Sequence, residues 1–358
     1  VDEAGAVDGV IRNADAATAS AGRSPPAEPG SDSGSDSEPG SDPGDGGSEP
    51  ASSTTTGDDR PDDSPTEPAQ PASTVPYPEI TDEITPAQGG VRALLSPTGV
   101  LVGVTGQTSS GYVVETPCGG VTTLVWGQPI AGAQVVLDPG HGGDEAGANE
   151  GGQLTEAELN LRLARRTAAE LTERSISVVL TRNGDYRIPI SRRAALADSI
   201  GPEAFVSIHH NTPASRPSPQ PGTEVFVQTA SDRSRRLGGL LYEEVFGALS
   251  QFDVEWTSRD DAGVLSVVND DGEDAYGIAR YPTTTSALIE MAYLGNEKEA
   301  VLLATDDYLE AAAIALADGI QRFLTTEEPG TGFVDQPRVF NPSGVTGGTT
   351  GCVDPPLE

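Results

Sequence analysis

Three histidines occur in this 358-residue chain, and the first has an unusual setting. In "VVLDPGHGG", a β-branched apolar run stops at an Asp-Pro-Gly turn, and His141 follows between glycines. This pattern predicts an imidazole on a bare loop at the C-terminal end of a buried strand, where missing side chains leave room for a ligand or a metal ion. Taken alone, an ordinary surface histidine is the simpler interpretation.

A carboxylate with a well-defined place follows in "LTEAEL". Thr155 and Glu158 have the spacing of a capping box. Leu154 and Leu159 occupy the two positions of a hydrophobic staple. The pattern predicts Thr155 as the N-cap and Glu156 as the first helical residue, where the helix dipole keeps a carboxylate ionised, as a metal ligand requires. A glutamate that only complements the dipole is the alternative.

The other two histidines are neighbours in "FVSIHHN". On a strand, the side chains of His209 and His210 point to opposite faces, so only one of them can join His141. A histidine at the end of a buried strand is unfavourable unless it is hydrogen-bonded or coordinated. Periodicity alone leaves open which of the two faces the same cleft as His141.

A fourth candidate, Glu290, lies inside the apolar run "SALIEMAY". Burial raises the pKa of an unpaired carboxyl group. This setting suits a general acid or base that works near neutral pH. A structural buried glutamate is the less common alternative.

Together these residues form a chemically coherent set. Two histidines and one carboxylate supply three zinc ligands and leave a fourth position for water. A further carboxylate can take the proton of that water. The sequence therefore predicts one Zn²⁺ per chain, in a cleft formed where strands end and a helix begins.

The elements that must position this set alternate between strands and helices. Near-continuous apolar strands separated by helices predict an α/β fold, with a twisted, mostly parallel sheet and helices on both faces. In such sheets, sites gather at strand ends. The strands are expected at 133–138, 177–182, 204–210, 223–229 and 286–293, and the helices at 154–171, 191–200, 234–249 and 308–324.

Composition divides the chain into four parts. Residues 1–80 contain 17 acidic residues and three arginines, with Pro, Ser and Gly in abundance, so a disordered acidic linker is expected there. Residues 85–130 are expected to form a small β-rich module, residues 131–326 the catalytic domain, and residues 327–358 an extended Gly/Pro-rich tail. A formal charge of −34 argues against nucleic acid as a partner.

The cysteines and the methionine bear on the cellular compartment. A bridge between Cys118 and Cys352 would tie the C-terminal tail to the body and require an oxidising compartment, whereas two free thiols are the alternative. The single methionine is Met291, so we expect that Val1 is not a translation start and that the N-terminus was processed or cut, for which removal of a signal peptide is one explanation. No apolar run is long enough to span a membrane.

Five stretches resemble the zinc-dependent N-acetylmuramoyl-L-alanine amidases of the type-3 amidase family, which are cell-wall hydrolases. They are "VVLDPGHGGDEAGA", "TEAELNLRLARR", "VVLTRNGDYRIPISRRAALAD", "FVSIHHN" and "SALIEMAYLGNEKEA", and they cover roughly residues 133–324. The resemblance implies a phosphorylase/hydrolase-like zinc amidase fold. After the catalytic glutamate the family commonly has Gly-Phe-Leu-Ser-Asn with one residue between, whereas this chain has "AYLGN", in which Ala292 and Gly295 are the departures.

The resemblance also implies a role for each candidate residue. It assigns zinc to His141, Glu156 and His209, and the catalytic carboxylate to Glu290. His210 then becomes a neighbour of the ligands. Arg182 and Arg192 match recurrent family positions, and we interpret both as residues that support the site.

The activity implied by the resemblance is hydrolysis of the amide between N-acetylmuramic acid and L-alanine in peptidoglycan. This activity serves cell-wall remodelling and daughter-cell separation. We expect a monomer that acts outside the cytoplasm, where it is secreted, periplasmic or bound to the wall. Two alternatives are a zinc peptidase with other substrates and a non-catalytic wall-binding or regulatory module. The acidic residues 253–281 are hard to place, and the rim of a substrate groove is one interpretation.

Overall fold

The computed structural model describes residues 77–149, 154–212, 216–342 and 347–358. The acidic linker predicted over residues 1–80 therefore lies almost entirely outside the described residues. The helices are η1 (Gln88–Gly90), α1 (Glu156–Glu173), α2 (Ile190–Ile200), α3 (Asp232–Leu249), α4 (Gly277–Arg280), α5 (Glu297–Leu303) and α6 (Asp306–Thr325).

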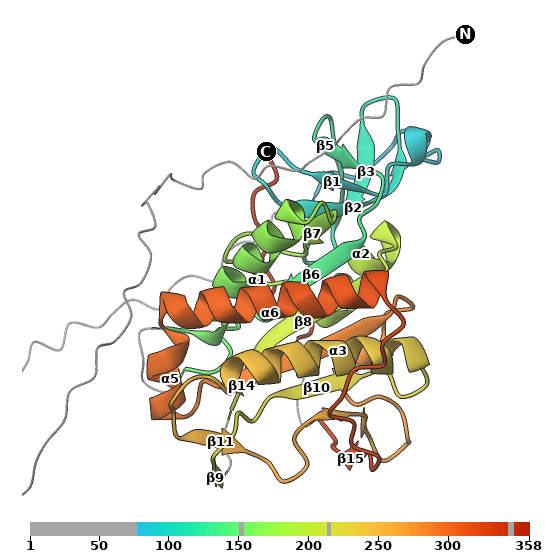
Figure 1. The fold of residues 1–358 in the computed structure, drawn as a ribbon. Coiled ribbons are helices and arrows are strands. Elements are labelled where there is room, and N and C mark those ends of the chain that lie inside the picture. The colour runs from blue at the N-terminus through green and yellow to red at the C-terminus, as the bar shows by residue number, and fades with distance from the viewer. Residues whose placement is uncertain (1–76, 150–153, 213–215, 343–346) are drawn as a thin grey trace, which may run out of the picture. The chain divides into compact units, whose positions relative to one another are not determined.

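The strands of the described residues form two sheets and two short ribbons (Figure 1). Across the central sheet the order is β12 (Val264–Leu265), β10 (Glu224–Val227), β14 (Ser286–Tyr293), β8 (Ala204–Asn211), β6 (Val135–Pro139) and β7 (Val178–Leu180). The smaller sheet has the order β4 (Val121–Leu124), β3 (Tyr112–Glu115), β2 (Leu101–Gln107), β1 (Ala93–Leu95) and β5 (Gln128–Ile130). The ribbons pair β9 (Arg216–Ser218) with β11 (Trp256–Ser258), and β13 (Val267–Val268) with β15 (Arg338–Val339).

The central sheet is mixed and differs in part from the expectation of a mostly parallel sheet, because one of its strand pairings is antiparallel. Strands β14, β8, β6 and β7 run parallel to one another. Strand β10 pairs with β14 antiparallel, and β12 runs parallel to β10. Parallel strands need a crossover connection, usually a helix. The described residues between β8 and β10 contain no helix, so the chain returns in the opposite direction.

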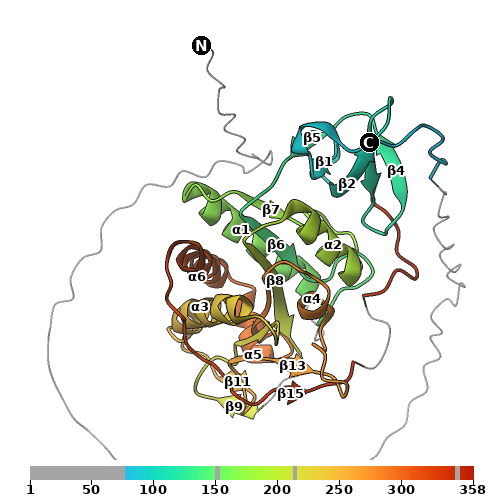
Figure 2. The same cartoon turned by 90° about the vertical axis from the view of Figure 1, so that its right-hand side faces the viewer.

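Helices cover both faces of this sheet, as predicted. In Figure 2, α1, α3 and α6 lie on one side of β6 and β8, and α2 and α4 lie on the other. The start of α1 follows its local signal, because the Thr155 hydroxyl accepts a hydrogen bond from the Glu158 amide at 3.2 Å. That N-cap fixes Glu156 at the first turn, as the sequence predicts.

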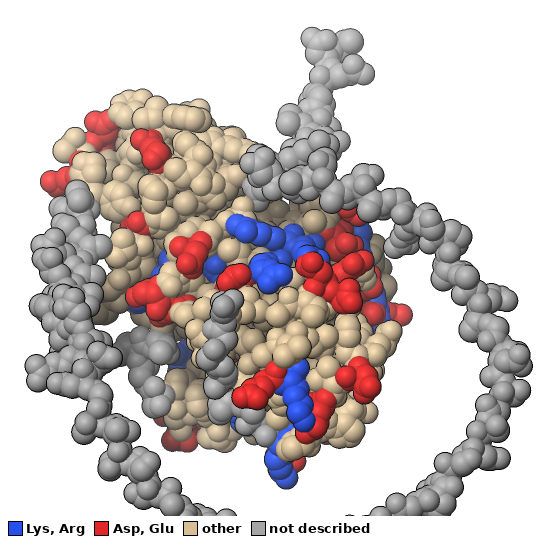
Figure 3. Space-filling model, turned by 90° about the vertical axis from the view of Figure 1, so that its left-hand side faces the viewer, with Lys and Arg blue, Asp and Glu red and all other residues tan. Residues whose placement is uncertain are grey.

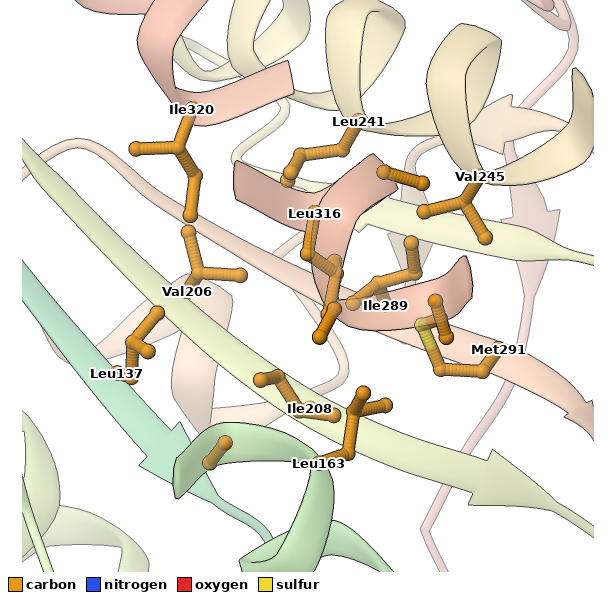
Figure 4. Close-up of a cluster of buried hydrophobic side chains, with 14 of the residues drawn as sticks. Leu137, Leu163, Val206, Ile208, Leu241, Val245, Ile289, Met291, Leu316 and Ile320 are labelled. Carbon is orange, nitrogen blue, oxygen red and sulfur yellow. The ribbon is translucent and has the colours of Figure 1, made fainter. Parts of the chain in front are cut away.

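The main core lies between the sheet and the three larger helices. Figure 4 shows side chains from β6, β8 and β14 meeting those of α1, α3 and α6. Truncating one such buried leucine or isoleucine to alanine removes about 2–5 kcal/mol of stability. The labelled members are Leu137, Leu163, Val206, Ile208, Leu241, Val245, Ile289, Met291, Leu316 and Ile320.

The smaller sheet is antiparallel and is joined to the end of the chain. Cys118 and Cys352 form a disulfide with a Cα–Cα distance of 5.6 Å, so the predicted bridge is confirmed and the alternative of two free thiols is wrong. Leu357 packs into the core of this sheet. Asp354 accepts hydrogen bonds from the Thr116 hydroxyl and the Cys118 amide. The C-terminal tail is therefore held in place.

Two further features are the distribution of charge on the surface and the apolar character of the helices. On the face shown in Figure 3, lysine and arginine side chains lie in patches flanked by acidic ones. Among the residues that the structure describes, no helix combines the length and the apolar character needed to cross a membrane.

Candidate active site

A cavity of about 660 Å³ brings the four predicted residues together. His141 follows the end of β6, Glu156 begins α1, His209 lies near the end of β8, and Glu290 lies within the adjacent strand β14. Glu290 and His209 are register partners on these parallel strands. Four segments far apart in the sequence thus contribute to one site.

The loop that carries His141 has a constrained backbone. His141 has a φ of 60°, a left-handed conformation that is uncommon outside glycine and typical of functional turns. A Cβ atom at Gly140 would lie 2.2 Å from the His209 ring, and one at Gly147 would lie 2.4 Å from the Glu156 carboxylate. Both glycines are therefore required for the close approach of the three candidate ligands.

The candidate ligand atoms of His141, Glu156 and His209 all lie within 4.8 Å of one another. The Glu156 carboxylate approaches His141 Nε2 at 3.2 Å with one oxygen and His209 Nδ1 at 3.0 Å with the other. Imidazole nitrogens and a carboxylate are donors that zinc accepts, and three of them are the number found in catalytic zinc sites. The donor set thus fits a zinc ion.

Hydrogen bonds orient the Glu156 carboxylate. It accepts bonds from the Ala148 amide at 2.8 Å, the His210 amide at 3.1 Å and the Asn160 side chain at 3.3 Å. Burial alone would raise the pKa of Glu156, but its bonds and charge interactions with His141 and His209 hold that pKa well below its usual range. The carboxylate is therefore ionised, as a metal ligand must be.

A buried ion pair supports the loop from behind. Asp138 and Arg193 are linked at 2.8 Å, and Arg193 also donates to the carbonyls of Pro139 and His141. Asp138 accepts further bonds from Thr181 and Ser207. Burial would raise the pKa of Asp138, but the Arg193 charge and these bonds hold it below its usual range.

Arg182 and Arg192 have different surroundings. Arg182 donates to the carbonyls of Pro139, Gly140 and Ala157, so it supports the His141 loop. Burial and the nearby Arg193 lower the pKa of Arg182 to about 10. Arg192 instead pairs with Glu115 of the smaller sheet at 2.6 Å. The charged residue of α2 that lines the cavity is Arg193, which sequence reasoning missed although it directly follows Arg192.

His210 points away from the cavity's three candidate ligands. Its Nδ1 lies 2.7 Å from Oδ1 of the Asn160 side chain, and its Nε2 lies 2.6 Å from the Tyr308 hydroxyl. Burial lowers the pKa of His210 to about 3, so the ring is neutral. A neutral ring that donates to Asn160 and accepts from Tyr308 satisfies both of its nitrogens.

The opposite side of the cavity carries two carboxylates. Glu290 and Glu224 face each other in the register of β14 and β10. Glu224 bonds to Asn211 at 2.7 Å and pairs with Arg338, whereas Glu290 Oε2 has no hydrogen-bond partner among the described residues. Burial, then the charges of Glu156 and Glu224, raises the pKa of Glu290 well above its usual range. Glu290 thus has the protonation behaviour expected of a general acid or base.

The C-terminal tail contributes to this side as well. Arg338 and Phe340 line the cavity, and Gly347 donates a hydrogen bond from its amide to Glu145 at 2.9 Å. The residues of the hard-to-place acidic stretch that line the same cavity are Arg259, Tyr276, Gly277 and Ile278. No sequence signal identified Arg338, because the tail reads as Gly/Pro-rich and featureless.

The fold and the site define an enzyme suited to metal-dependent hydrolysis, with an α/β sheet whose strand ends carry histidine and carboxylate groups. A family model described as N-acetylmuramoyl-L-alanine amidase matches residues 135–322. The chain belongs to this amidase family.

Individual relatives agree with the family match. N-acetylmuramoyl-L-alanine amidase AmiC of Neisseria meningitidis is 29% identical over 221 residues, which are 54% of this chain and 53% of AmiC. N-acetylmuramoyl-L-alanine amidase LytC of Bacillus subtilis is 29% identical over 224 residues, which are 61% of this chain and 41% of LytC. The chain thus spans about half or less of these two relatives.

A solved structure similar to this chain is N-acetylmuramoyl-L-alanine amidase AmiC2 of Nostoc punctiforme. It is 28% identical, with a TM-score of 0.45, over 53% of this chain and 96% of that one.

Proposed function

We propose that residues 131–326 form a catalytic domain that hydrolyses the amide between N-acetylmuramic acid and L-alanine in peptidoglycan, with one zinc ion per chain. One observation carries the proposal: in a chain of the amidase family, two imidazoles and an ionised carboxylate converge in the cavity that also holds the unpaired Glu290.

The zinc ion would be held by one ring nitrogen of His141, one ring nitrogen of His209 and the Glu156 carboxylate. A zinc ion with such ligands lowers the pKa of a bound water and polarises a carbonyl. Hydrogen bonds would keep the donors in place with or without the metal ion. The Glu156 carboxylate accepts bonds from the Ala148 amide and the Asn160 side chain, and Arg193 donates to the His141 carbonyl.

Glu290 is the proposed general base and acid. Its Oε2 is unpaired among the described residues, so it is free to accept a proton from the attacking water. The raised pKa favours the protonated form that follows, from which the proton can pass to the leaving amine of L-alanine. Glu224 remains occupied by Arg338 and Asn211, which supports Glu290 as the carboxylate that moves the proton.

We infer that the enzyme acts outside the cytoplasm as a monomer. The Cys118–Cys352 disulfide supports this location, because such bonds persist in oxidising compartments. Turnover of the wall at that location agrees with a role in remodelling and daughter-cell separation.

Mass spectrometry of reaction products tests the proposed function. The zinc-loaded protein is incubated with purified sacculi and with soluble muropeptides. We expect stem peptides with a free N-terminal L-alanine, together with glycan that keeps a free lactyl carboxylate. Cuts only between stem residues would instead indicate a peptidase, and binding without any product would indicate a non-catalytic wall-binding module.

A further inference from the structure

Three consecutive charged residues, Arg259, Asp260 and Asp261, follow β11. Asp260 pairs with Arg216 of the neighbouring ribbon strand β9. Asp261 binds Arg338 of the C-terminal tail through both of its oxygens, at 2.8 and 2.9 Å. Both aspartates are therefore engaged by other segments, and the turn that carries Arg259 is anchored on two sides.

Arg259 differs from the other cations that line the cavity. Arg193 is buried and paired with Asp138, and Arg338 is paired with Glu224 and Asp261. Arg259 lines the same cavity, stays exposed, and makes no ion pair with a carboxylate in the described part of the chain. Its guanidinium donates a hydrogen bond to the Tyr293 side chain, and its charge acts to lower the pKa of Glu290. A cation without an acidic partner thus lies beside the proposed catalytic carboxylate.

The negative charge around Arg259 indicates which kind of ligand this cation could bind. Five carboxylates line the cavity, and the whole chain has a formal charge of −34. An anionic ligand would be repelled unless a local cation compensated. In the proposed substrate the sugar is neutral and the lactyl carboxyl is consumed in the scissile amide. Any carboxylate near that amide therefore belongs to the stem peptide.

We propose that Arg259 is a specificity-determining residue that pairs with a free carboxylate of the stem peptide beyond the scissile amide. The inference rests on the proposed function and adds a substrate preference to it. Guanidinium and carboxylate form charge-assisted, often bidentate hydrogen bonds, and an amide in place of the carboxylate forms only neutral ones. The enzyme accordingly prefers stems whose second residue keeps its carboxylate over stems in which it is amidated.

The test uses two muramyl tripeptides, both closed as C-terminal amides. In one, the γ-linked D-glutamate after L-alanine has a free α-carboxylate, and in the other this group is an amide. We expect the zinc-loaded full chain to cleave the first with a kcat/KM about tenfold higher, which is the size of one hydrogen bond to a charged group. Arg259→Gln removes this preference by slowing the carboxylate substrate more than the amide substrate, so the ratio of the two kcat/KM values falls to about one, and Arg259→Lys keeps part of the preference.

Two controls separate this role from folding and from turnover. Arg233→Gln removes an exposed arginine on α3 that pairs with Glu203 and is not among the residues that line the cavity, and it keeps the full preference. Calorimetric binding to Glu290→Gln protein shows the same preference without turnover, and the added Arg259→Gln change abolishes it.

The outcomes are distinct. If wild type cleaves both peptides equally, or if Arg259→Gln leaves the ratio of the two kcat/KM values unchanged, the role of Arg259 is wrong and the amidase function stands. If wild type cleaves neither peptide at the L-alanine amide, the proposed function fails, and the inference fails with it.

Discussion

The two walls of the cavity are built in different ways. The wall with the candidate metal ligands comes from β6, β8 and the start of α1, and buried hydrogen bonds fix it at Asp138, Glu156 and Arg193. The opposite wall combines β10 and β14 with the turn after β11 and the C-terminal tail. Among the described residues, Glu290 Oε2 has no hydrogen-bond partner there, and Arg259 has no ion-pair partner. We call these the ligand wall and the substrate wall.

This difference indicates a division of labour. A metal site must hold its ligands in one geometry, so redundant buried bonds are an advantage there. Groups that move protons or bind a substrate must stay without a fixed partner in the protein, and this lowers the stability of the fold. Changes in the ligand wall should therefore affect metal binding and folding, and changes in the substrate wall should affect turnover.

The largest effect should come from the substrate wall. Glu290→Gln keeps the shape of the side chain but removes its ability to accept a proton, so we expect kcat/KM on muropeptides to fall about 10³-fold. Zinc content should stay at the wild-type level, measured by inductively coupled plasma mass spectrometry. A variant that still releases stem peptides at a substantial rate would show that Glu290 is not the proton carrier.

In the ligand wall, Asp138→Asn should chiefly affect folding. It leaves the buried charge of Arg193 without its partner, which lowers the free energy of unfolding by about 3–5 kcal/mol in urea titrations. Ser207→Ala is the matched control, because it removes one hydrogen bond to Asp138 and lowers that free energy by only about 1 kcal/mol. Equal losses in both variants would mean that the ion pair does not support the loop.

Removal of the disulfide is another test of the difference between the two walls, because the disulfide anchors the tail that contributes Arg338 to the substrate wall. Replacing Cys118 and Cys352 by serine together should lower the free energy of unfolding by about 2–5 kcal/mol. The tail reaches the loop after His141 through the Gly347–Glu145 bond, but in the described residues no tail residue bonds to His141, Glu156 or His209, so zinc content should not change. Loss of zinc from this variant would contradict the separate construction of the two walls.

A smaller effect should appear in the metal-free protein as a function of pH. Since the folded-state pKa of Glu290 is raised above the ordinary 4.5, its contribution to stability is full below that pH and is lost as the pH rises toward the folded value. Glu290→Gln cannot lose a proton, so its Tm should exceed that of wild type at pH 8 and match it at pH 4. A difference that does not change with pH would refute the raised pKa.

Much of this arrangement could be predicted from local sequence signals. The N-cap at Thr155 and the buried strands of the central sheet follow from patterns of a few residues. The orientation of β10 could not be predicted, because it depends on a connection that lacks a helix. His141 and Glu290 were found because each interrupts a pattern, and Glu156 because it fits a capping box, whereas the choice of His209 over His210 came only from the family resemblance.

The residues that complete the site were not found, for a physical reason. Asp138 was interpreted only as part of a turn, and Arg193 only as part of an amphipathic helix. Their importance comes from contact with each other across 55 positions, and a single sequence does not show such contacts. Arg259 and Arg338 lie in loop and tail segments without periodicity, so only the fold reveals what they face.

The metal content of single-histidine variants tests the central claim most directly. We predict about one zinc per chain in wild type and in His210→Ala, and a near-complete loss of zinc in His141→Ala and in His209→Ala. Retention of zinc by both of the latter variants, or its loss from His210→Ala alone, would contradict the assignment of the ligand wall.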